Sequence, residues 1–206
     1  ISNKAAMFGL DARIALAIFG ALSVISGAAL YSAIQTAKAE QARQILNEIS
    51  KASEAYYLDN GQPIPQNSSN YTYTSDLLAN RESLTSWQGP YIDGEQWSIL
   101  ALTNTLTKSI DPSSSIYIRL LQSSDWAANN SMQECASVGN TDCSEWVDVH
   151  CGYTATGKLN AESLFTKLDA MVDNSDGALK GNIRAVNLGG NWYHLQFKGM
   201  PRKRSI

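Results

Sequence analysis

The sequence is poor in charged residues. Asp, Glu, Lys and Arg make up 17% of its 206 residues, whereas they make up about a quarter of an ordinary globular domain. The net charge is −3, so the chain as a whole offers no electrostatic basis for binding nucleic acid. The residues Lys198, Arg202, Lys203 and Arg204 form a basic cluster, which we interpret as a solvated terminus. DNA binding is therefore not supported.

Motifs for catalysis are also missing. There is no glycine-rich phosphate loop. Of the two histidines, neither His150 nor His194 has a Ser or Cys nucleophile in a recognisable elbow, and His194 is expected at the surface or the edge of the core. His150-Cys151 with Cys143 fits no CxxC framework for zinc. We expect a protein that is not an enzyme and has no cofactor.

Cysteine is absent from the first 134 residues. The three cysteines, Cys135, Cys143 and Cys151, all lie within one 17-residue window. In an oxidising compartment this pattern predicts one local disulfide and one remaining thiol, with the pairing left open. Three reduced, cytosolic cysteines are the alternative, which the apolar segment near the N-terminus disfavours.

That apolar segment has no charge between Arg13 and Lys38. Ile14 to Ile34 is a run of 21 residues, which as a helix would reach about 30 Å, the hydrocarbon thickness of a bilayer. It is too long for the apolar region of a signal peptide, which spans about 7–15 residues. The run predicts a membrane-spanning helix. Its many small residues, among them Gly20, Ala21, Gly27 and Ala28, predict close packing against other helices.

The helical pattern continues beyond the apolar run, because neither Pro nor Gly occurs between Gly27 and Gly61. We predict one helix from about Leu10 to Leu58, apolar all round in its first half and amphipathic in its second. The apolar face of the second half is formed by Ala42, Ile45, Ile49, Ala52 and Tyr56.

The rest of the chain, residues 59–206, is expected to form a globular α+β head with an antiparallel sheet packed on the long helix. Period-two alternation and turn residues predict strands at 96–102, 115–122, 145–150, 183–188 and 192–198. A second helix is predicted over 160–172, with Asn160 or Ser163 as its cap. Trp87-Gln88-Gly89-Pro90-Tyr91-Ile92 predicts a turn that its aromatic rings hold against the core.

A hydrophobic half-helix that continues into an amphipathic half carrying a head resembles the type IV pilins and type II secretion pseudopilins. Met7-Phe8-Gly9-Leu10-Asp11 also resembles their processing site. The resemblance implies cleavage between Ala6 and Met7, although Ala6 stands where the family usually has Gly. It divides the chain into a leader remnant (1–6), a membrane and filament-core half-helix (7–34), an amphipathic half-helix (35–58) and a head (59–206) with a cysteine-bounded region (135–151).

Cleavage there would make Asp11 the fifth residue of the mature chain, where the family usually has Glu. The resemblance implies that Asp11 neutralises the N-terminal amine of an adjacent subunit during assembly; a helix cap is the alternative. Its implied partners are prepilin peptidase, the assembly machinery, and copies of itself and related pilins in a helical filament. The implied location is the bacterial inner membrane, then an extracellular filament or a periplasmic pseudopilus.

Two alternatives to a filament subunit are a bitopic periplasmic binding or enzyme domain with a simple anchor, and a secreted domain. An anchored domain predicts a flexible linker after the apolar run, and the uninterrupted pattern to Leu58 disfavours it. The pattern does not distinguish a major from a minor subunit, or a pilus from a secretion pseudopilus.

One segment carries a weak metal-binding pattern. Asp173-Asn174-Ser175-Asp176-Gly177 places oxygen ligands at alternate positions before a glycine, as calcium loops do. It lacks the downstream Glu of an EF-hand, and these residue types favour turns. A turn is therefore the preferred interpretation, with Ca²⁺ at Asp173 and Asp176 as the alternative.

Overall fold

The computed structural model describes residues 3–66, 72–93, 98–100, 105–107, 115–128, 131–135, 142–151, 155–190 and 192–201. The chain forms two compact units, Ile1–Lys38 and Ala39–Ile206. The first unit is helical, and the second contains the sheet and the core.

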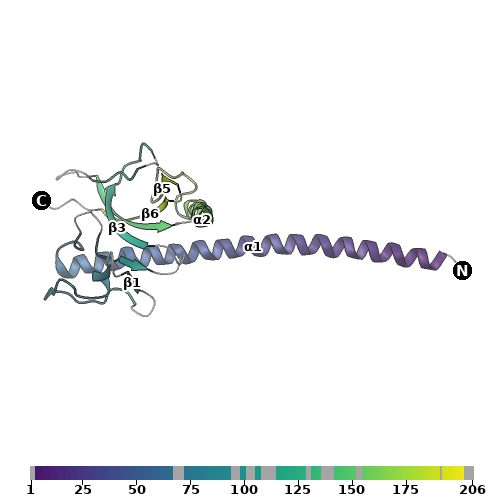
Figure 1. Ribbon diagram of the computed structural model, residues 1–206, viewed down its shortest axis with the longest axis horizontal. Helices are drawn as coiled ribbons and strands as arrows, with labels where there is room; N and C mark the ends of the chain where they lie inside the picture. The colour runs from purple at the N-terminus through teal and green to yellow at the C-terminus, as the bar shows by residue number, and fades with distance from the viewer. Residues whose placement is uncertain are drawn as a thin grey trace. The chain divides into compact units, whose positions relative to one another are not determined.

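Helix α1, Asn3–Asn60, runs through both units (Figure 1). The prediction of one unbroken helix is confirmed, although α1 begins before Leu10 and ends two residues after Leu58. Gly61 ends the helix: its backbone has φ +64° and its N–H donates to the Tyr57 carbonyl at 2.8 Å. A glycine in this left-handed conformation is the usual way for a helix to terminate.

The second half of α1 contributes one face to the core of the head. Its buried residues recur at three- and four-residue spacing, as expected for an amphipathic helix; they are Ala39, Ala42, Ile45, Leu46, Ile49, Ala52 and Tyr56. They join apolar side chains from the strands, including Ile118, Val147 and Leu195, in one cluster. The predicted face is therefore confirmed, with Ala39 and Leu46 added to it.

The sheet is antiparallel throughout, in the order β1-β2-β3-β4-β6-β5. Its strands are β1 Ser98–Leu100, β2 Thr105–Thr107, β3 Ser115–Gln122, β4 Cys143–Cys151, β5 Ile183–Gly189 and β6 Trp192–Pro201. All five predicted strands are present and β3 has the predicted bounds, whereas β2 was not predicted. The architecture is thus α+β, with one long N-terminal apolar helix and an antiparallel sheet.

Helix α2, Ala155–Val172, lies against β5 and β6 (Figure 1). It begins five residues before the predicted start, so the prediction that Asn160 or Ser163 caps it is wrong. Both side chains are exposed within the helix. Leu168 is fully buried, and Leu164 and Phe165 pack against the core, so burial of this stripe holds α2 in place.

The segment from Trp87 to Ile92 forms the predicted packed turn, with a cis peptide bond between Gly89 and Pro90. The Tyr91 ring lies edge-on to Trp87 and to Tyr56, with centroids 5.6 Å apart in both pairs. The Tyr91 N–H donates to the Leu77 carbonyl at 2.8 Å, at the end of a short 3-10 helix, η1, Thr74–Leu77. These contacts fasten the turn to the end of α1.

Candidate functional site

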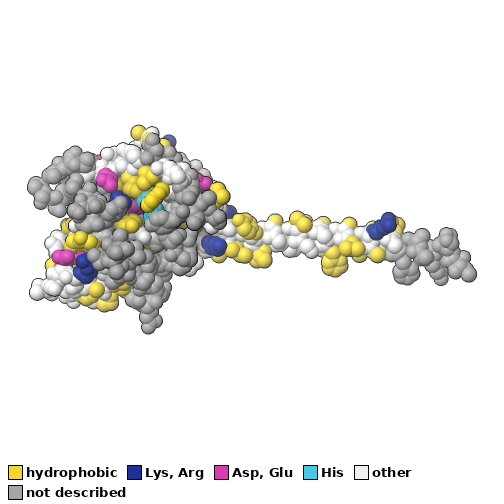
Figure 2. All heavy atoms as spheres, in the orientation of Figure 1, with side chains coloured by type: hydrophobic (Ala, Val, Ile, Leu, Met, Phe, Trp, Pro, Cys, Tyr) yellow, Lys and Arg dark blue, Asp and Glu magenta, His cyan; other side chains and the backbone are white. Residues whose placement is uncertain are grey.

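The first half of α1 is a continuous apolar surface that nothing in the described part of the chain covers. Figure 2 shows apolar side chains along this part of the helix, with basic ones only near its ends. The exposed large side chains are Leu10, Ile14, Leu16, Ile18, Phe19, Leu22, Val24, Ile25, Leu30, Tyr31 and Ile34. Soluble monomers rarely expose so extended an apolar surface, so this one is suited to lipid or to other helices.

This is a helix long and apolar enough to cross a membrane. Its most apolar 18-residue window has a mean hydropathy of 2.1, and none of that window is buried. Removing a large aliphatic side chain from water contributes about 1.5–3 kcal/mol. These side chains are already partly shielded along the helix, so covering the set would contribute on the order of 10 kcal/mol.

The four small residues singled out from the sequence lie on this surface. Gly20 and Gly27 are one heptad apart, as are Ala21 and Ala28, so each pair shares a face of the helix. A Cβ built on Gly20 or Gly27 would meet no atom within 4 Å. The described residues thus leave room for a second backbone to approach closely at these glycines.

Asp11 is exposed and lies within α1, which begins at Asn3. Asp11 therefore does not cap the helix in this chain, and it forms no ion pair with Arg13. Ala6 and Met7 belong to α1, but their side chains lie outside the described residues. The predicted cleavage between them remains a prediction.

The disulfide of the head joins Cys135 to Cys143, with Cα atoms 6.3 Å apart. Cys135 follows β3, where its N–H donates to the Leu120 carbonyl, and Cys143 begins β4. Cys151, at the other end of β4, is buried and outside any disulfide; its Sγ lies 3.7 Å from the Val149 carbonyl. One local disulfide and one remaining thiol were predicted, and the structure supplies the pairing. A disulfide is typical of proteins outside the reducing cytosol.

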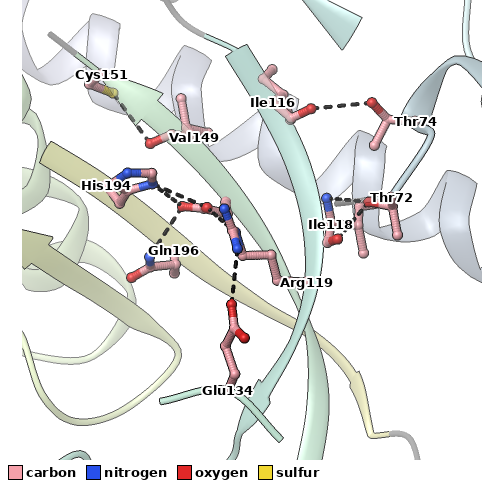
Figure 3. Close-up of polar contacts among 11 residues, drawn as sticks. Thr72, Thr74, Ile116, Ile118, Arg119, Glu134, Val149, Cys151, His194 and Gln196 are labelled. Atoms are coloured by element: carbon pink, nitrogen blue, oxygen red, sulfur yellow. Dashed lines mark hydrogen bonds and ion pairs between the residues drawn. The ribbon is translucent and has the colours of Figure 1, made fainter. Parts of the chain in front are cut away.

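A buried ionic network occupies the face of the sheet opposite the apolar core (Figure 3). Asp148 is fully buried and accepts from Arg119 Nε at 2.7 Å and Gln196 Nε2 at 3.1 Å, and His194 Nδ1 lies 3.0 Å away. Burial alone would raise the pKa of Asp148, but His194 and Arg119 together hold it below its ordinary value. The expectation that His194 lies at the surface or core edge is wrong: it is 4% exposed.

His150 lies beside this network, between the rings of Trp192 and His194. Its ring stacks on Trp192 and on His194, each with centroids 4.6 Å apart. Burial, and then the charge of His194, lower the pKa of His150 to about 4. A neutral His150 can pack inside this stack, and among the described residues no group of three potential metal ligands includes it.

Two cationic side chains support neighbouring parts of the head. The Arg184 guanidinium stacks over Trp146, 4.5 Å from the ring centroid, and donates to the carbonyls of Gln122, Ser123 and Ser124. These bonds hold the chain that leaves β3. Lys198 Nζ also donates to the Ser123 carbonyl at 3.3 Å, so its assignment to a solvated terminus is wrong; Arg202, Lys203 and Arg204 lie outside the described residues.

Asp76 is buried under the packed turn. Burial is the main cause that raises its pKa to about 6, although Arg81 lies 3.3 Å from its Oδ1 and opposes the shift. Trp87 Nε1 donates to the Asp76 carbonyl at 3.1 Å. This carboxyl is therefore an ionisable group held among the aromatic contacts that fasten the turn.

Asp173 and Asp176 come together with a third carboxyl, that of Asp169. Sequence reasoning missed Asp169, which lies in α2 about one helical turn before Asp173. Asp169, Asp173 and Asp176 form the only cluster of three potential metal-ligating side chains among the described residues.

Comparison with known proteins identifies no relative: no family model, no curated protein and no solved structure matches this chain.

Proposed function

We propose that this protein is a structural subunit of a type IV pilus-like filament, a pilin or pseudopilin, which the first half of α1 holds in the inner membrane before assembly. The observation that carries the proposal is that a single helix changes character along its length. From Ile14 to Ile34 its large side chains are apolar and exposed, and from Ala39 onward one face belongs to the core of the head.

An unbroken helix favours a filament subunit over an anchored domain. An independent periplasmic domain needs only a flexible linker to its anchor, whereas α1 has no break between Asn3 and Asn60. The same helix supplies both the apolar segment and part of the core of the head, so the chain has no linker between them. That property suits a subunit whose helices pack into a shared bundle.

Asp11 supplies a specific interaction for assembly. It is an acidic side chain beside a segment of membrane length, where an unpaired charge costs up to about 2.5–3.5 kcal/mol at the bilayer centre. The N-terminal ammonium of a neighbouring subunit would remove that cost. Gly20 and Gly27 would let the helices of neighbouring subunits approach closely.

The test compares Asp11→Asn with a matched control, Asp59→Asn, in the native host. Asp59 is exposed near the other end of α1. We expect Asp11→Asn to leave the protein in the membrane fraction but to reduce its amount in sheared surface filaments by about tenfold, the effect of losing about 1.4 kcal/mol. Asp59→Asn should behave as wild type. Intact mass of the filament protein should give a chain that begins at Met7.

Equal filament yields for Asp11→Asn and wild type would refute the assembly role of Asp11. A protein that keeps its leader and is never recovered outside the membrane would favour the bitopic anchored domain. A chain that begins near Ile34 would identify the apolar run as a signal sequence.

A further inference from the structure

Two side chains of opposite charge lie at the start of the apolar part of α1. Between Leu10 and Ile34 the only charged residues are Asp11 and Arg13. Both side chains are exposed, and neither forms an ion pair among the described residues. A bundle of such helices would bury both charges, and buried charges in proteins are paired.

The geometry of the helix keeps these two charges apart. Residues two positions apart point about 160° away from each other around the helix axis, and side chains at that spacing do not face each other. Asp11 and Arg13 therefore project from opposite sides of α1 at nearly the same level. Each needs an opposite charge from outside its own helix.

Large apolar side chains follow Asp11 along its side of the helix. Ile18 and Ile25 lie seven and fourteen residues after Asp11, so the three share one face. Leu22 lies beside them, and the three apolar side chains are 55%, 66% and 56% exposed in the order Ile18, Ile25, Leu22. We call this side of α1 the aspartate face; it consists of Asp11, Ile18, Leu22 and Ile25.

Glycines follow Arg13 along the opposite side. Gly20 and Gly27 lie seven and fourteen residues after Arg13, and a Cβ built on either glycine would meet no atom within 4 Å. Val24, eleven residues or about three turns after Arg13, lies at the margin of this side and is exposed. We call it the arginine face; it consists of Arg13, Gly20, Val24 and Gly27, and its glycines leave room for large side chains of another helix.

The two faces match position by position between parallel helices. A shift of two residues, about 3 Å along the axis, sets the aspartate face of one helix against the arginine face of a second. In that register the facing pairs are Asp11 with Arg13, Ile18 with Gly20, and Ile25 with Gly27. An antiparallel neighbour aligns at most one of these pairs. Charge and shape are therefore complementary together only in the parallel register.

We propose that the aspartate face of one copy of this chain packs against the arginine face of the next copy in the filament, with a salt bridge from Arg13 to Asp11. A guanidinium can donate two parallel hydrogen bonds to a carboxylate, which fixes the register as well as the partner. A carboxylate has about four lone-pair positions, so Asp11 can also accept from the N-terminal ammonium of a neighbouring subunit.

This proposal rests on the proposed function and names the second charge that α1 uses in assembly. The contact joins two different faces of the same helix, so each copy has one such neighbour on either side. Such a heterologous contact repeats along an open assembly, whereas a contact between identical faces closes into a dimer. The arrangement of charges on α1 thus suits a filament.

The first test removes the charge of Arg13 in the native host and measures the protein in sheared surface filaments. Arg13→Gln should lower the yield about threefold to tenfold, while Arg13→Lys should keep most of it. Lys38→Gln, which removes an exposed charge at the other end of the apolar run, should behave as wild type. In an Asp11→Asn chain, adding Arg13→Gln should cause no further decrease, because the partner charge is already gone.

The second test locates the contact by oxidative cross-linking of sheared filaments with copper phenanthroline. Leu22→Cys/Val24→Cys places one thiol on each face in the same two-residue register, and it should give a ladder of covalent oligomers on a gel without reductant. The control Leu30→Cys/Ser32→Cys has the same spacing on exposed positions, but it points about 80° further around the helix. It should give little cross-linking.

The native cysteines provide a clean background for this test. Cys135 and Cys143 already form a disulfide and Cys151 is buried, so a ladder requires the introduced thiols. No ladder from Leu22→Cys/Val24→Cys, or dimers alone, would overturn the heterologous contact. A ladder of equal strength from the control pair would overturn the assignment of the two faces.

The Arg13 variants separate this interface from the filament proposal itself. If Arg13→Gln gives the wild-type yield while Asp11→Asn is impaired, the interface is wrong and the proposed function stands. If adding Arg13→Gln to Asp11→Asn lowers the yield further, the two charges act independently and the pairing is wrong. If the wild-type chain forms no filament, the proposed function fails and the interface fails with it.

Discussion

His150 and Asp76 should give the stability of the head two opposing pH dependences. His150 is 3% exposed and Asp76 is 2% exposed. Burial is the main cause of both pKa shifts: it lowers that of His150 from 6.5 to about 4 and raises that of Asp76 from 3.8 to about 6. Each shift disfavours the charged form of its own group. Histidine is charged below its pKa and aspartate above its pKa, so the two shifts have opposite effects on the pH dependence.

The sign follows from proton binding in the folded and unfolded states. Between pH 6.5 and 4 the unfolded chain binds a proton at His150 that the folded chain does not, so stability falls as the pH falls. Between pH 6 and 3.8 the folded chain binds a proton at Asp76 that the unfolded chain does not, so this group makes stability rise as the pH falls. From pH 7 to pH 4.5 each effect amounts to about 2 kcal/mol, and they largely cancel.

Single substitutions should separate the two effects. His150→Phe keeps a flat ring between Trp192 and His194 and removes the titrating group; Asp76→Asn keeps the shape of the buried carboxyl. Relative to wild type, the change in unfolding free energy from pH 7 to pH 4.5 should be about 2 kcal/mol more favourable for His150→Phe and about 2 kcal/mol less favourable for Asp76→Asn.

Urea unfolding of the full chain in detergent micelles, followed by tryptophan fluorescence at both pH values, measures these differences. Comparison with wild type removes the contributions of the other titrating groups, which the variants share. A His150→Phe variant with the wild-type pH dependence would refute the reasoning for His150. The same result for Asp76→Asn would refute the reasoning for the buried carboxyl under the packed turn.

Two further predictions concern what holds the sheet together. Asp148→Ala should lower the free energy of urea unfolding by about 3–5 kcal/mol, because it leaves Arg119 and His194 buried without their shared anion. The half-exposed carboxylate of Glu134 also pairs with Arg119, and Glu134→Ala should lower it by under about 1 kcal/mol. Equal losses for the two variants would contradict this ranking. Replacing both Cys135 and Cys143 by Ser opens a loop of sequence separation 8 and should cost about 2.5 kcal/mol. Reduction should lower the wild-type Tm but not that of the double variant; an equal decrease in both would contradict the contribution of the disulfide.

Much of the fold was predictable because it depends on local periodicity. The absence of Pro and Gly between Gly27 and Gly61 predicts an unbroken helix, and the apolar spacing from Ala42 to Tyr56 predicts which face is buried. Alternation predicts β3 with its observed bounds. The short strand β2 was missed, because three residues are too few to show a period.

The polar sites were less predictable, because they depend on strand register and chain reversal. His194 sits opposite His150 and beside Asp148 only because β4 pairs with β6 in one particular register, which the sequence of neither strand specifies. The choice of Cys135 with Cys143 likewise depends on where β3 ends and β4 begins. Asp169 could have been noticed from its spacing, but its buried oxygen is visible only in the folded chain.

The sequence by itself determined the long helix with its apolar first half, because continuous hydrophobicity and the absence of helix breakers act within one segment. Only the tertiary structure decided the disulfide pairing, the buried ionic network behind the sheet and the convergence of three carboxyls at the end of α2. The physical reason is that each of these depends on distances between segments far apart along the chain or reversed by a turn. Those distances are set by the packing of the whole head.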